Sequence, residues 1–491
     1  MLPILRSHQQ YPSFIEERLR LHYSNGSLLF IAKDWALVAK FWVTDLSDTF
    51  QCVKGTYSCR GPQSIDPANL LRSYLLMLEV GEPSITMWVN QLRRCPLYAI
   101  LSGFEYGHTP GVGTFYDFFG RLWNHVSPNI ASRRRLSRKK PKRGKKGEKA
   151  PTTNPKRIAK LISQLQRRTA IRSQPFDVLL RLFQQQFLSV SSSLWFVRNV
   201  HALSIAGDGM PVQTAAQIRS KRICSCRDQG KNQCSCHRQF SQPDCDMGWD
   251  SYRNKFYFGY HLYSLVAADS PYDLPIYPRL QRASRHDATS WVVSAREFKA
   301  YFREYTWDRV LLDAAHDAMA IYEYLRSQKI TPFIDMNQRN TGNKKYKDDM
   351  MISRNGVPIC KKGLEMRDRG YDSSRARRKY HCPLVVKGVV TCDTPCSVSP
   401  YGRCVHTYTK DNPRLFPPVA RNSNEWTNIY KRRTTCERSN KRAKEDYHLE
   451  AAKHRSTMMW TIRVYGIAMC QHIDAWYQES NLDLKPMLLS A

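Results

Sequence analysis

Apolar residues recur every three or four positions through much of the first 130 residues, which is the spacing of one buried face of an α-helix. The clearest helix begins at Asp66, whose carboxylate can cap the first turn and which precedes a proline suited to the first helical position. Ser84 can cap a second helix, and Thr109, again followed by proline, introduces a third. We therefore expect an all-helical domain over residues 1–130. Its short helices suit a helix-turn-helix DNA reader, although a helical domain that only packs has the same periodicity.

The hydrophobic pattern becomes that of β-strands after about residue 195. Short apolar runs and one long alternating run predict three antiparallel-looking strands, and later strands alternate with helices, which is typical of a mixed α/β sheet. The expected strands are residues 200–206, 255–268, 275–280, 309–312 and 331–334. The expected helices are residues 155–195, 290–301 and 314–327.

Composition narrows the class of protein. The 491 residues suggest about three domains, and 42% hydrophobic residues are enough to build a core, which argues against wholesale disorder. The longest uncharged run, residues 256–268, is shorter than the roughly 20 apolar residues of a membrane-spanning helix, and the first ten residues do not resemble a secretory signal. We expect a soluble, cytosolic protein. Lys and Arg total 76 against 42 for Asp and Glu, and this net charge of +34 points to a polyanionic partner such as nucleic acid.

Part of the positive charge lies in one segment. Residues 131–150 contain eleven Lys or Arg and one acid, and a run of this kind repels itself and cannot be buried. We expect a basic flexible linker over residues 131–155 that contacts DNA phosphates, with Arg138, Lys139 and Lys140 as candidate contacts. A solvated tether without DNA contacts is the alternative.

Two aspartates are expected to end strands of the sheet. Asp208, in Gly207-Asp208-Gly209, follows the first strand, and Asp313 follows the strand over 309–312. Taken singly, each is more typical of a turn or a helix cap than of a functional site. Asp287, His286 and Asp317 lie close by in the sequence, and capping or turn roles explain them better.

A third carboxylate lies on an expected helix near the C-terminal end. Four residues at offsets 0, 3, 7 and 14 fall within an arc of about 60° on this helix, and two more lie close to the same stripe. The four are Tyr430, Arg433, Glu437 and Lys444, and the two are Asn440 and Lys441. A solvated face ordinarily alternates charge signs, whereas here one glutamate stands among cations, which suits a face that follows phosphates.

The spacing Tyr430-x2-Arg433-x3-Glu437-x6-Lys444, with Asp208 and Asp313 upstream, resembles the DDE transposases of bacterial insertion sequences that carry the Y-R-E-K signature. The resemblance covers roughly residues 195–475. It implies an α/β fold of the RNase H-like, retroviral integrase superfamily, with a mixed five-stranded sheet, flanking helices and an insertion before the catalytic glutamate.

The resemblance also implies an activity and its cofactors. Asp208 would bridge two Mg²⁺ (or Mn²⁺) ions, and Asp313 and Glu437 would each hold one, because such ions prefer carboxylate oxygens. Tyr430, Arg433 and Lys444 would contact phosphates near the scissile bond, with Lys441 and Asn440 beside them. The protein would act as an endonuclease at element ends with inverted repeats and join them to target DNA. It would work as a homodimer or larger synaptic complex on the bacterial nucleoid.

These observations divide the chain into five parts. The expected parts are a helical DNA-binding domain (1–130), the basic linker (131–155), the first part of the catalytic core (156–345, with a Cys-rich insert at about 221–250), a Cys-containing insertion domain (346–425), and the C-terminal part of the core with the glutamate helix (426–491).

Fifteen cysteines in a chain without an export signal favour metal ligation over disulfides. The simplest Zn²⁺ ligand set is Cys224, Cys226, Cys234 and Cys236, with His237 or Cys245 as a substitute. A second, less specific group lies in the insertion and has unligated buried thiols as its alternative. That group is Cys360, Cys382, Cys392, Cys396 and Cys404.

Two other functions fit the same sequence. A zinc-stabilised DNA-binding protein without catalysis would need no carboxylate triad, and a stand-alone RNase H-like nuclease would cleave DNA without joining it.

Overall fold

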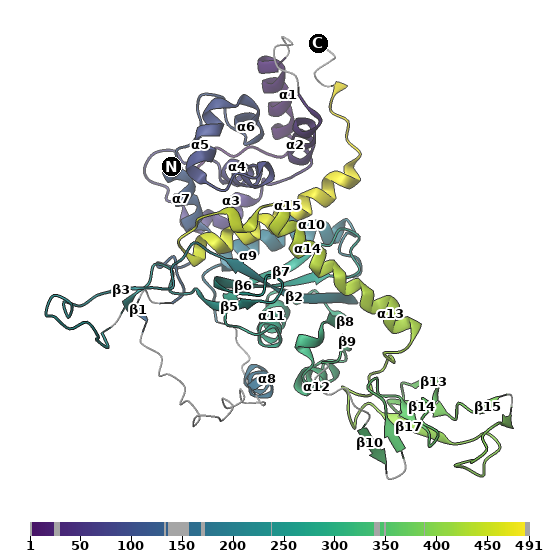
Figure 1. Cartoon of the computed structure of the whole chain (residues 1–491). Helices are drawn as coiled ribbons and strands as arrows, with labels where there is room; N and C mark the ends of the chain where they lie inside the picture. Colours follow the sequence, from purple (N-terminus) through teal and green to yellow (C-terminus); the bar gives the residue numbers. More distant parts are fainter. Residues whose placement is uncertain are drawn as a thin grey trace.

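The helical N-terminal region lies against a β-sheet that carries helices on both faces, and a β-rich insertion projects away from the sheet (Figure 1). The computed structural model describes residues 2–23, 30–131, 134–135, 157–167, 172–236, 238–337, 344–347, 350–386 and 388–486. Most of the basic linker therefore lies outside the described residues, as do Arg138, Lys139, Lys140 and His237. Among the helices that are described, none has the length and apolar character needed to cross a bilayer.

The N-terminal region is helical, as the hydrophobic pattern predicts. Asp66 accepts a hydrogen bond from the backbone of Ala68 at the start of its helix, and Ser84 caps the next helix. The third helix of the prediction begins at Val112, three residues after Thr109. The helices are α1 (Gln10–Tyr23), α2 (Ala32–Trp42), α3 (Thr49–Val53), α4 (Pro67–Val80), α5 (Ile85–Arg94), α6 (Pro96–Leu101) and α7 (Val112–Arg121).

The N-terminal helices share a hydrophobic core with the rest of the protein. The last helix, α15 (Thr457–Ser480), packs against α2 and α4 on one side and against the sheet on the other. Gly466 permits the closest approach, because a Cβ there would lie 2.6 Å from Leu78 and 2.9 Å from Tyr74 of α4. One cluster of buried side chains runs from α1 through α15 to the strands.

The sheet is mixed, as expected. β2 pairs antiparallel with β6, β6 pairs antiparallel with β7, and β8 and β9 continue the sheet in parallel beside β2. Within the described chain the sheet has six strands, where the sequence led us to expect five. Since β5 pairs with residues 255–259 of β6 and β7 with residues 260–266, the two share one edge. The strands are β2 (Leu203–Gln213), β5 (Asp246–Asp250), β6 (Lys255–Ala267), β7 (Pro275–Arg282), β8 (Trp307–Leu312) and β9 (Thr331–Ile334).

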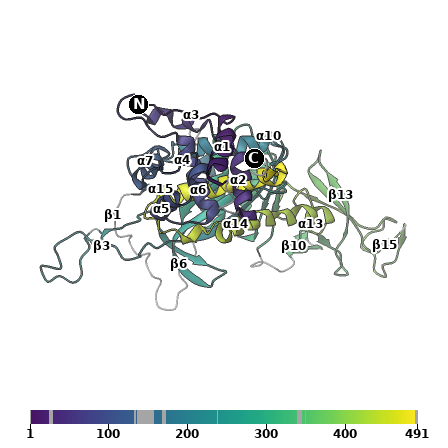
Figure 2. The same ribbon diagram turned by 90° about the horizontal axis from the view of Figure 1, so that it is seen from above.

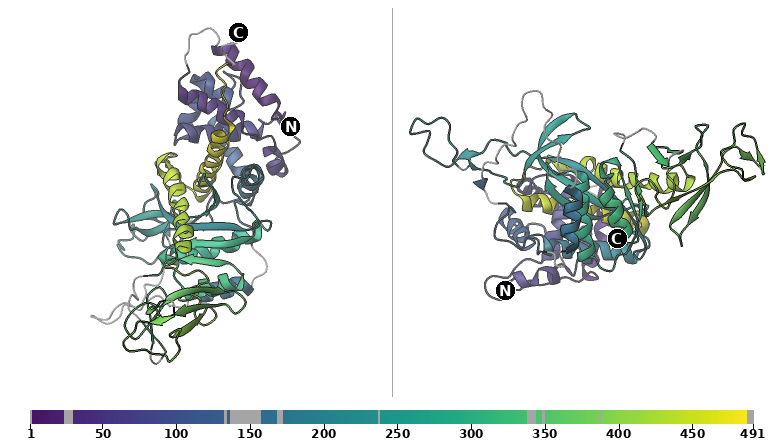
Figure 3. Two further views of the ribbon diagram at one scale, coloured as in Figure 1. Left: turned by 90° about the vertical axis from the view of Figure 1, so that its right-hand side faces the viewer. Right: turned by 90° about the horizontal axis from the view of Figure 1, so that it is seen from below.

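Helices cover both faces of the sheet (Figures 1 and 3). One face carries α11, α12 and α8, and the other carries α14 and α15. The helix expected over 314–327 is split into a 3-10 turn at Ala314–His316 and α12, and α9 continues through a π-helical turn into α10. The helices are α8 (Arg157–Arg167), α9 (Asp177–Phe183), α10 (Ser189–Ser193), α11 (Asp287–Tyr301), α12 (Met319–Ser327), α13 (Asn424–Tyr430) and α14 (Thr434–Glu445).

Two β-rich segments project from opposite ends of the molecule (Figure 2). One is the Cys-rich insert between β2 and β6, and the other is the insertion between β9 and α13. The first carries β3 (Lys221–Arg222) and β4 (Arg238–Gln239), which pair with each other, and β4 also pairs with β1 (Arg134–Arg135). The insertion strands are β10 (Lys344–Lys347), β11 (Met350–Ile352), β12 (Pro358–Ile359), β13 (Arg367–Asp372), β14 (Arg377–His381), β15 (Val385–Val386), β16 (Val389–Val390) and β17 (Cys404–Tyr408).

Candidate active site

Asp208 lies inside β2, and the expectation that it ends the first strand is wrong. Parallel pairing of β2 with β8 stops at Ala206, but β2 continues against β6 as far as Gln213. Extending the β2–β8 register by two residues brings Asp208 level with Asp313, which follows the last residue of β8. The two aspartates therefore meet where the parallel strands diverge.

The glycines on either side of Asp208 provide space rather than a turn. A Cβ at Gly207 would lie 2.6 Å from the hydroxyl of Tyr263. A Cβ at Gly209 would lie 2.2 Å from Oδ1 of Asp287 and 2.3 Å from the ring of His261. Because successive strand residues face opposite sides of a sheet, the glycines face α11 while the aspartate between them faces α14.

Asp313 is held by a buried hydrogen-bond network. Nδ1 of His316 lies 2.6 Å from Oδ1 of Asp313, and Nε2 lies 2.7 Å from the hydroxyl of Tyr263. The backbone N–H of Ala315 donates to the same carboxylate oxygen over 3.1 Å. Burial would raise the pKa of Asp313, but the hydrogen bond with His316 holds it below the usual value. Both bonds use Oδ1, which leaves Oδ2 as the oxygen available to an ion.

Asp287 is a further carboxylate beside the two strands, which the sequence interpretation assigned to capping. Its Oδ1 lies 2.9 Å from Nε2 of His261 on β6. Capping of α11 is done by its neighbour His286, as expected, whose ring accepts from the backbone of Ala288. The only sequence signal for the Asp287–His261 pair is Gly209, which leaves room for both side chains. This signal can be interpreted only when the register of β2 and β6 is known.

The pKa of Asp208 is raised to about 6, first by burial and then by the charges of Asp313 and Asp287. His316 and Arg433 oppose this rise. A cluster of carboxylates that raises the pKa of one member binds a divalent cation favourably, because the ion replaces a proton and removes the mutual repulsion.

The glutamate helix lies over the same part of the sheet. α13 and α14 are joined by a 3-10 turn at Lys431–Arg433, so the helix is not regular over the whole predicted stripe. The thiol of Cys436 contacts the backbone oxygen of Ser264 on β6, the residue paired with Asp208. Glu437 follows on the helix, half exposed, and accepts a hydrogen bond from Arg433 over 2.6 Å. Arg433 also interacts electrostatically with Asp208.

The other predicted helix residues differ in their surroundings. Tyr430 stacks on the buried Trp426, and the guanidinium of Arg433 lies over its ring. Asn440 is buried, whereas Lys441 is exposed. Lys444 is further along the helix and lies 3.8 Å from Glu450. The structure brings Tyr430, Arg433 and Glu437 to the aspartates, and Lys444 lies beyond them.

Asp317, the other aspartate that follows β8 closely in the sequence, pairs with an arginine of the insertion and not with the carboxylate cluster. Its carboxylate is almost fully buried and binds Arg414, with distances of 2.7 and 2.5 Å to Nε and Nη2. It also accepts from the backbone N–H of Asn337. Asp317 therefore fastens the end of the insertion to the core.

The Cys-rich insert gathers four thiols. The ligand atoms of Cys224, Cys226, Cys234 and Cys236 all lie within 4.8 Å of one another. These thiols are only slightly buried. The pKa of Cys224 is lowered to about 7 by hydrogen bonds from the backbone of Cys226 and from Cys234. These four residues could hold one tetrahedral metal ion. Over the described residues, the three candidate carboxylates are spread more widely than these thiols.

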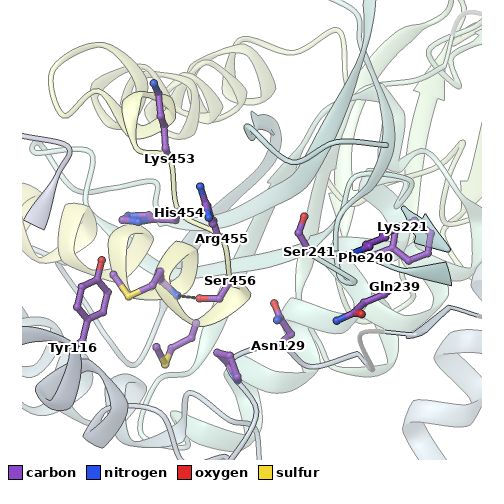
Figure 4. Close-up of a pocket in the computed structure, with 13 residues that line it drawn as sticks. Tyr116, Asn129, Lys221, Gln239, Phe240, Ser241, Lys453, His454, Arg455 and Ser456 are labelled. Carbon is purple, nitrogen blue, oxygen red and sulfur yellow. Dashed lines mark hydrogen bonds between the residues drawn. The ribbon is translucent and has the colours of Figure 1, made fainter. Parts of the chain in front are cut away.

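A large basic cavity of about 830 Å³ lies apart from the carboxylates. Figure 4 shows Lys453 and Arg455 on the chain that leads to Ser456, which caps α15. Lys221 of the Cys-rich insert and Tyr116 of α7 line other walls. The N-terminal helices, the Cys-rich insert and the C-terminal segment thus meet around cationic side chains.

Residues 236–471 match the family model described as the transposase DDE domain. The match supports a DDE transposase, an enzyme of DNA transposition whose family binds DNA, and the mixed α/β fold fits it. The matched segment contains Asp313 and Glu437 but begins after Asp208, whose place in the site rests on geometry alone. No curated protein matches the chain.

Proposed function

We propose that the protein is a transposase of the Y-R-E-K insertion-sequence type, which cleaves the ends of a mobile element and joins them to target DNA. The observation that carries this proposal is the packing of α14 on β2 and β6, where Cys436, the neighbour of Glu437, contacts the strand residue paired with Asp208. It links the signature helix to the carboxylate pair formed by β2 and β8. Three carboxylates from distant parts of the chain would thereby serve one site.

Asp208, Asp313 and Glu437 would hold two Mg²⁺ or Mn²⁺ ions. The fit rests on Asp208, whose pKa is raised by burial and by the charges of Asp313 and Asp287, because a divalent cation relieves both the burial of an unpaired charge and the repulsion. When bound, the ions activate a water or a 3′-hydroxyl and stabilise the leaving oxygen. The chain itself orients Asp313 through His316 and keeps Glu437 in place through Arg433.

Cationic residues around the site would hold the DNA. Arg433, Lys444 and Lys441 lie along the signature helix, with the Tyr430 hydroxyl and Asn440 beside them. The basic cavity around Lys453 would hold a second stretch of the DNA backbone. It lies between the N-terminal helices, the Cys-rich insert and the C-terminal segment, which suits an element end that runs past the N-terminal helices. Two ends must be joined, so we propose a homodimer or larger synaptic complex.

The four thiols of the Cys-rich insert would bind a structural Zn²⁺ ion. Their ligand atoms are close enough for one tetrahedral shell. The ion would fix the arm formed by β3 and β4.

The test uses a labelled duplex that ends in the element's terminal inverted repeat, together with a supercoiled target plasmid. With Mg²⁺, the wild-type protein is expected to nick the duplex at the repeat boundary and join the 3′ end to the plasmid. Asp208→Asn should abolish both steps while leaving duplex binding intact. Asp308→Asn is the matched control, because Asp308 is half exposed on β8 and pairs only with its neighbour Arg309 in the described structure.

The assay separates the proposed function from its rivals. Cleavage without joined product would indicate a stand-alone nuclease. Binding without cleavage at any divalent ion concentration would indicate a DNA-binding protein without catalysis. Cleavage by Asp208→Asn at the wild-type rate would remove Asp208 from the site.

A further inference from the structure

Four cysteines of the insertion line one small cavity. Cys360, Cys382, Cys392 and Cys396 come from separate stretches of the sequence and share the walls of a space of about 20 Å³. This volume is close to that of one water-sized sphere. Cys404, the fifth cysteine of the region, is exposed at the start of β17 and lies outside the residues that line it.

A turn at Cys360 and an ion pair connect the segments that carry Cys360 and Cys392. Cys360 begins a tight turn in which its carbonyl accepts from the N–H of Gly363 over 2.9 Å, and Gly363 adopts φ 77°. The side chain of Lys362 in this turn forms a 2.9 Å ion pair with Asp393, which directly follows Cys392. Another cysteine stands four positions after Cys392, and this C-x3-C spacing is in the range of structural zinc sites.

Cys382, which directly follows β14, makes further backbone contacts at the cavity. Its N–H donates to the carbonyl of Arg403 over 3.0 Å. Gly402 packs so closely that a Cβ there would lie 2.8 Å from the Cβ of Cys382, and Gly402 adopts φ 68°. The returning chain is therefore pressed against the cavity wall that carries Cys382.

The segment between Cys382 and Cys404 contributes nothing to the hydrophobic cluster of the insertion, since none of the described residues between 383 and 403 is buried. That cluster contains five buried residues. The five are Met350, Val357, Met366, Tyr380 and Val405. Val389, Val398 and Tyr401 are exposed instead. Small units that bury so little apolar surface are ordinarily stabilised by a metal ion or by disulfides.

We propose that the insertion binds a structural Zn²⁺ ion through the thiolates of Cys360, Cys382, Cys392 and Cys396. Four sulfur ligands around one small cavity favour tetrahedral zinc. Over the described residues, only the Cys-rich insert has all its ligand atoms within 4.8 Å, so the insertion site closes around the ion as it binds.

The charge around the cavity suits this complex. Four thiols lose four protons on binding, and four thiolates around Zn²⁺ carry a net charge of −2. Lys361 and Arg403 line the cavity and offset part of that charge, whereas Lys362, which also lines it, is paired with Asp393. The proposal is independent of the DNA chemistry, because it concerns only the stability of the insertion.

The first test counts zinc in the full-length protein, purified without chelator and analysed by mass spectrometry of the metal. We expect two ions in the wild-type chain, one in Cys392→Ser/Cys396→Ser, and one in Cys224→Ser/Cys226→Ser. The matched control, Cys404→Ser, should keep both. A zinc content in Cys392→Ser/Cys396→Ser equal to that of the wild type would overturn the proposal.

The second test uses only the wild-type chain, so a folding failure of the variant does not obscure it. Alkylation followed by peptide mapping should leave the four cavity thiols unmodified until a chelator or a mercurial is added, while Cys404 reacts at once. Immediate alkylation of the four thiols, or a disulfide between any two of them, would refute the site.

Discussion

Nδ1 of His316 lies 2.6 Å from Oδ1 of Asp313, and the imidazole is fully buried. Because Tyr263 bonds the other ring nitrogen, the ring can present Nδ1–H to the carboxylate and fix its orientation. We predict that His316→Ala lowers cleavage by about 10- to 100-fold and raises the Mg²⁺ concentration needed for half-maximal rate. His316→Asn keeps an N–H donor near the same place and should recover part of the loss.

Measurement of the cleavage rate at increasing Mg²⁺ concentrations tests the predicted effect of His316→Ala. An unchanged Mg²⁺ requirement in His316→Ala, with folding intact by circular dichroism, would mean that His316 only fills space. Tyr263→Phe removes the second hydrogen bond alone and should cause a smaller shift in the same direction.

Arg433 bonds Glu437 and opposes the rise in the pKa of Asp208, so it offsets part of the negative charge of the carboxylates. We therefore predict opposite effects of Arg433→Ala on two measurements. Mn²⁺ binding without DNA should tighten, because the carboxylates lose a competing cation. DNA cleavage should fall by at least about 10-fold, because the phosphate contact is lost. Calorimetry with Mn²⁺ and the cleavage assay measure the two effects.

Arg432→Ala is the matched control for charge. Arg432 is the preceding residue, it is more exposed, and it pairs with Asp269 outside the carboxylate cluster. It should leave Mn²⁺ binding unchanged. Weaker Mn²⁺ binding in Arg433→Ala would contradict the position that we assign to this arginine.

The long alternating run of β6, the strand before Asp313 and the caps at Asp66 and Ser84 follow from local pattern, and the structure confirms them. Local pattern failed at Asp208 because Asp-Gly is a common turn dipeptide. In the structure, Gly209 is extended, and pairing with β6 carries the strand past it. Whether such a dipeptide turns or extends depends on a partner strand that is distant in sequence.

Side-chain partners were the least predictable part of the site. His261 and Asp287 are 26 positions apart and come together only because β6 and the start of α11 flank the same glycine. The bond of Asp317 to Arg414 likewise depends on how the insertion returns to the core. The residue spacing singles out Asp313 and Glu437, and the matched segment contains both, but neither gives information on these contacts.

Replacing Gly209 by alanine tests the close approach at β2. The added Cβ would be 2.2 Å from Asp287, so we predict a loss of about 1–3 kcal/mol in stability and a reduced cleavage rate. Gly113→Ala is the control, because nothing lies within 4 Å of its added Cβ and a helical alanine is favourable. Thermal unfolding of both variants measures the difference. Equal midpoints would mean that His261 and Asp287 can shift without cost.

The basic cavity predicts a change in the salt dependence of DNA binding. Each phosphate contact contributes about 0.9 to the slope of log affinity against log salt concentration. Lys453→Ala and Arg455→Ala should each lower the slope by about that amount. Arg326→Ala, exposed on α12 across the sheet, should leave it unchanged. Fluorescence anisotropy with an element-end duplex at several salt concentrations measures these slopes, and an equal effect of Arg326→Ala would deny the cavity a special role.

A buried histidine joins α15 to the sheet and should make stability depend on pH. His472 bonds Ser191 over 2.7 Å and the backbone oxygen of Pro275 over 3.0 Å, and burial lowers its pKa to about 4. Between the ordinary pKa of about 6.5 and pH 4, the unfolded chain binds a proton that the folded chain does not. Stability at neutral pH is therefore lost as the pH falls through this window, by about 1.4 kcal/mol per pH unit for this residue.

The variant His472→Gln should be less stable at pH 7. Its stability should fall less steeply with decreasing pH, because one proton fewer is taken up on unfolding. Urea unfolding of the wild type and the variant at pH 7, 6 and 5 measures both slopes. The wild-type slope includes a contribution from His454, whose pKa burial lowers to about 3, and the variant retains it. Parallel stability curves for the two proteins would show that His472 takes up its proton equally in the folded and unfolded states.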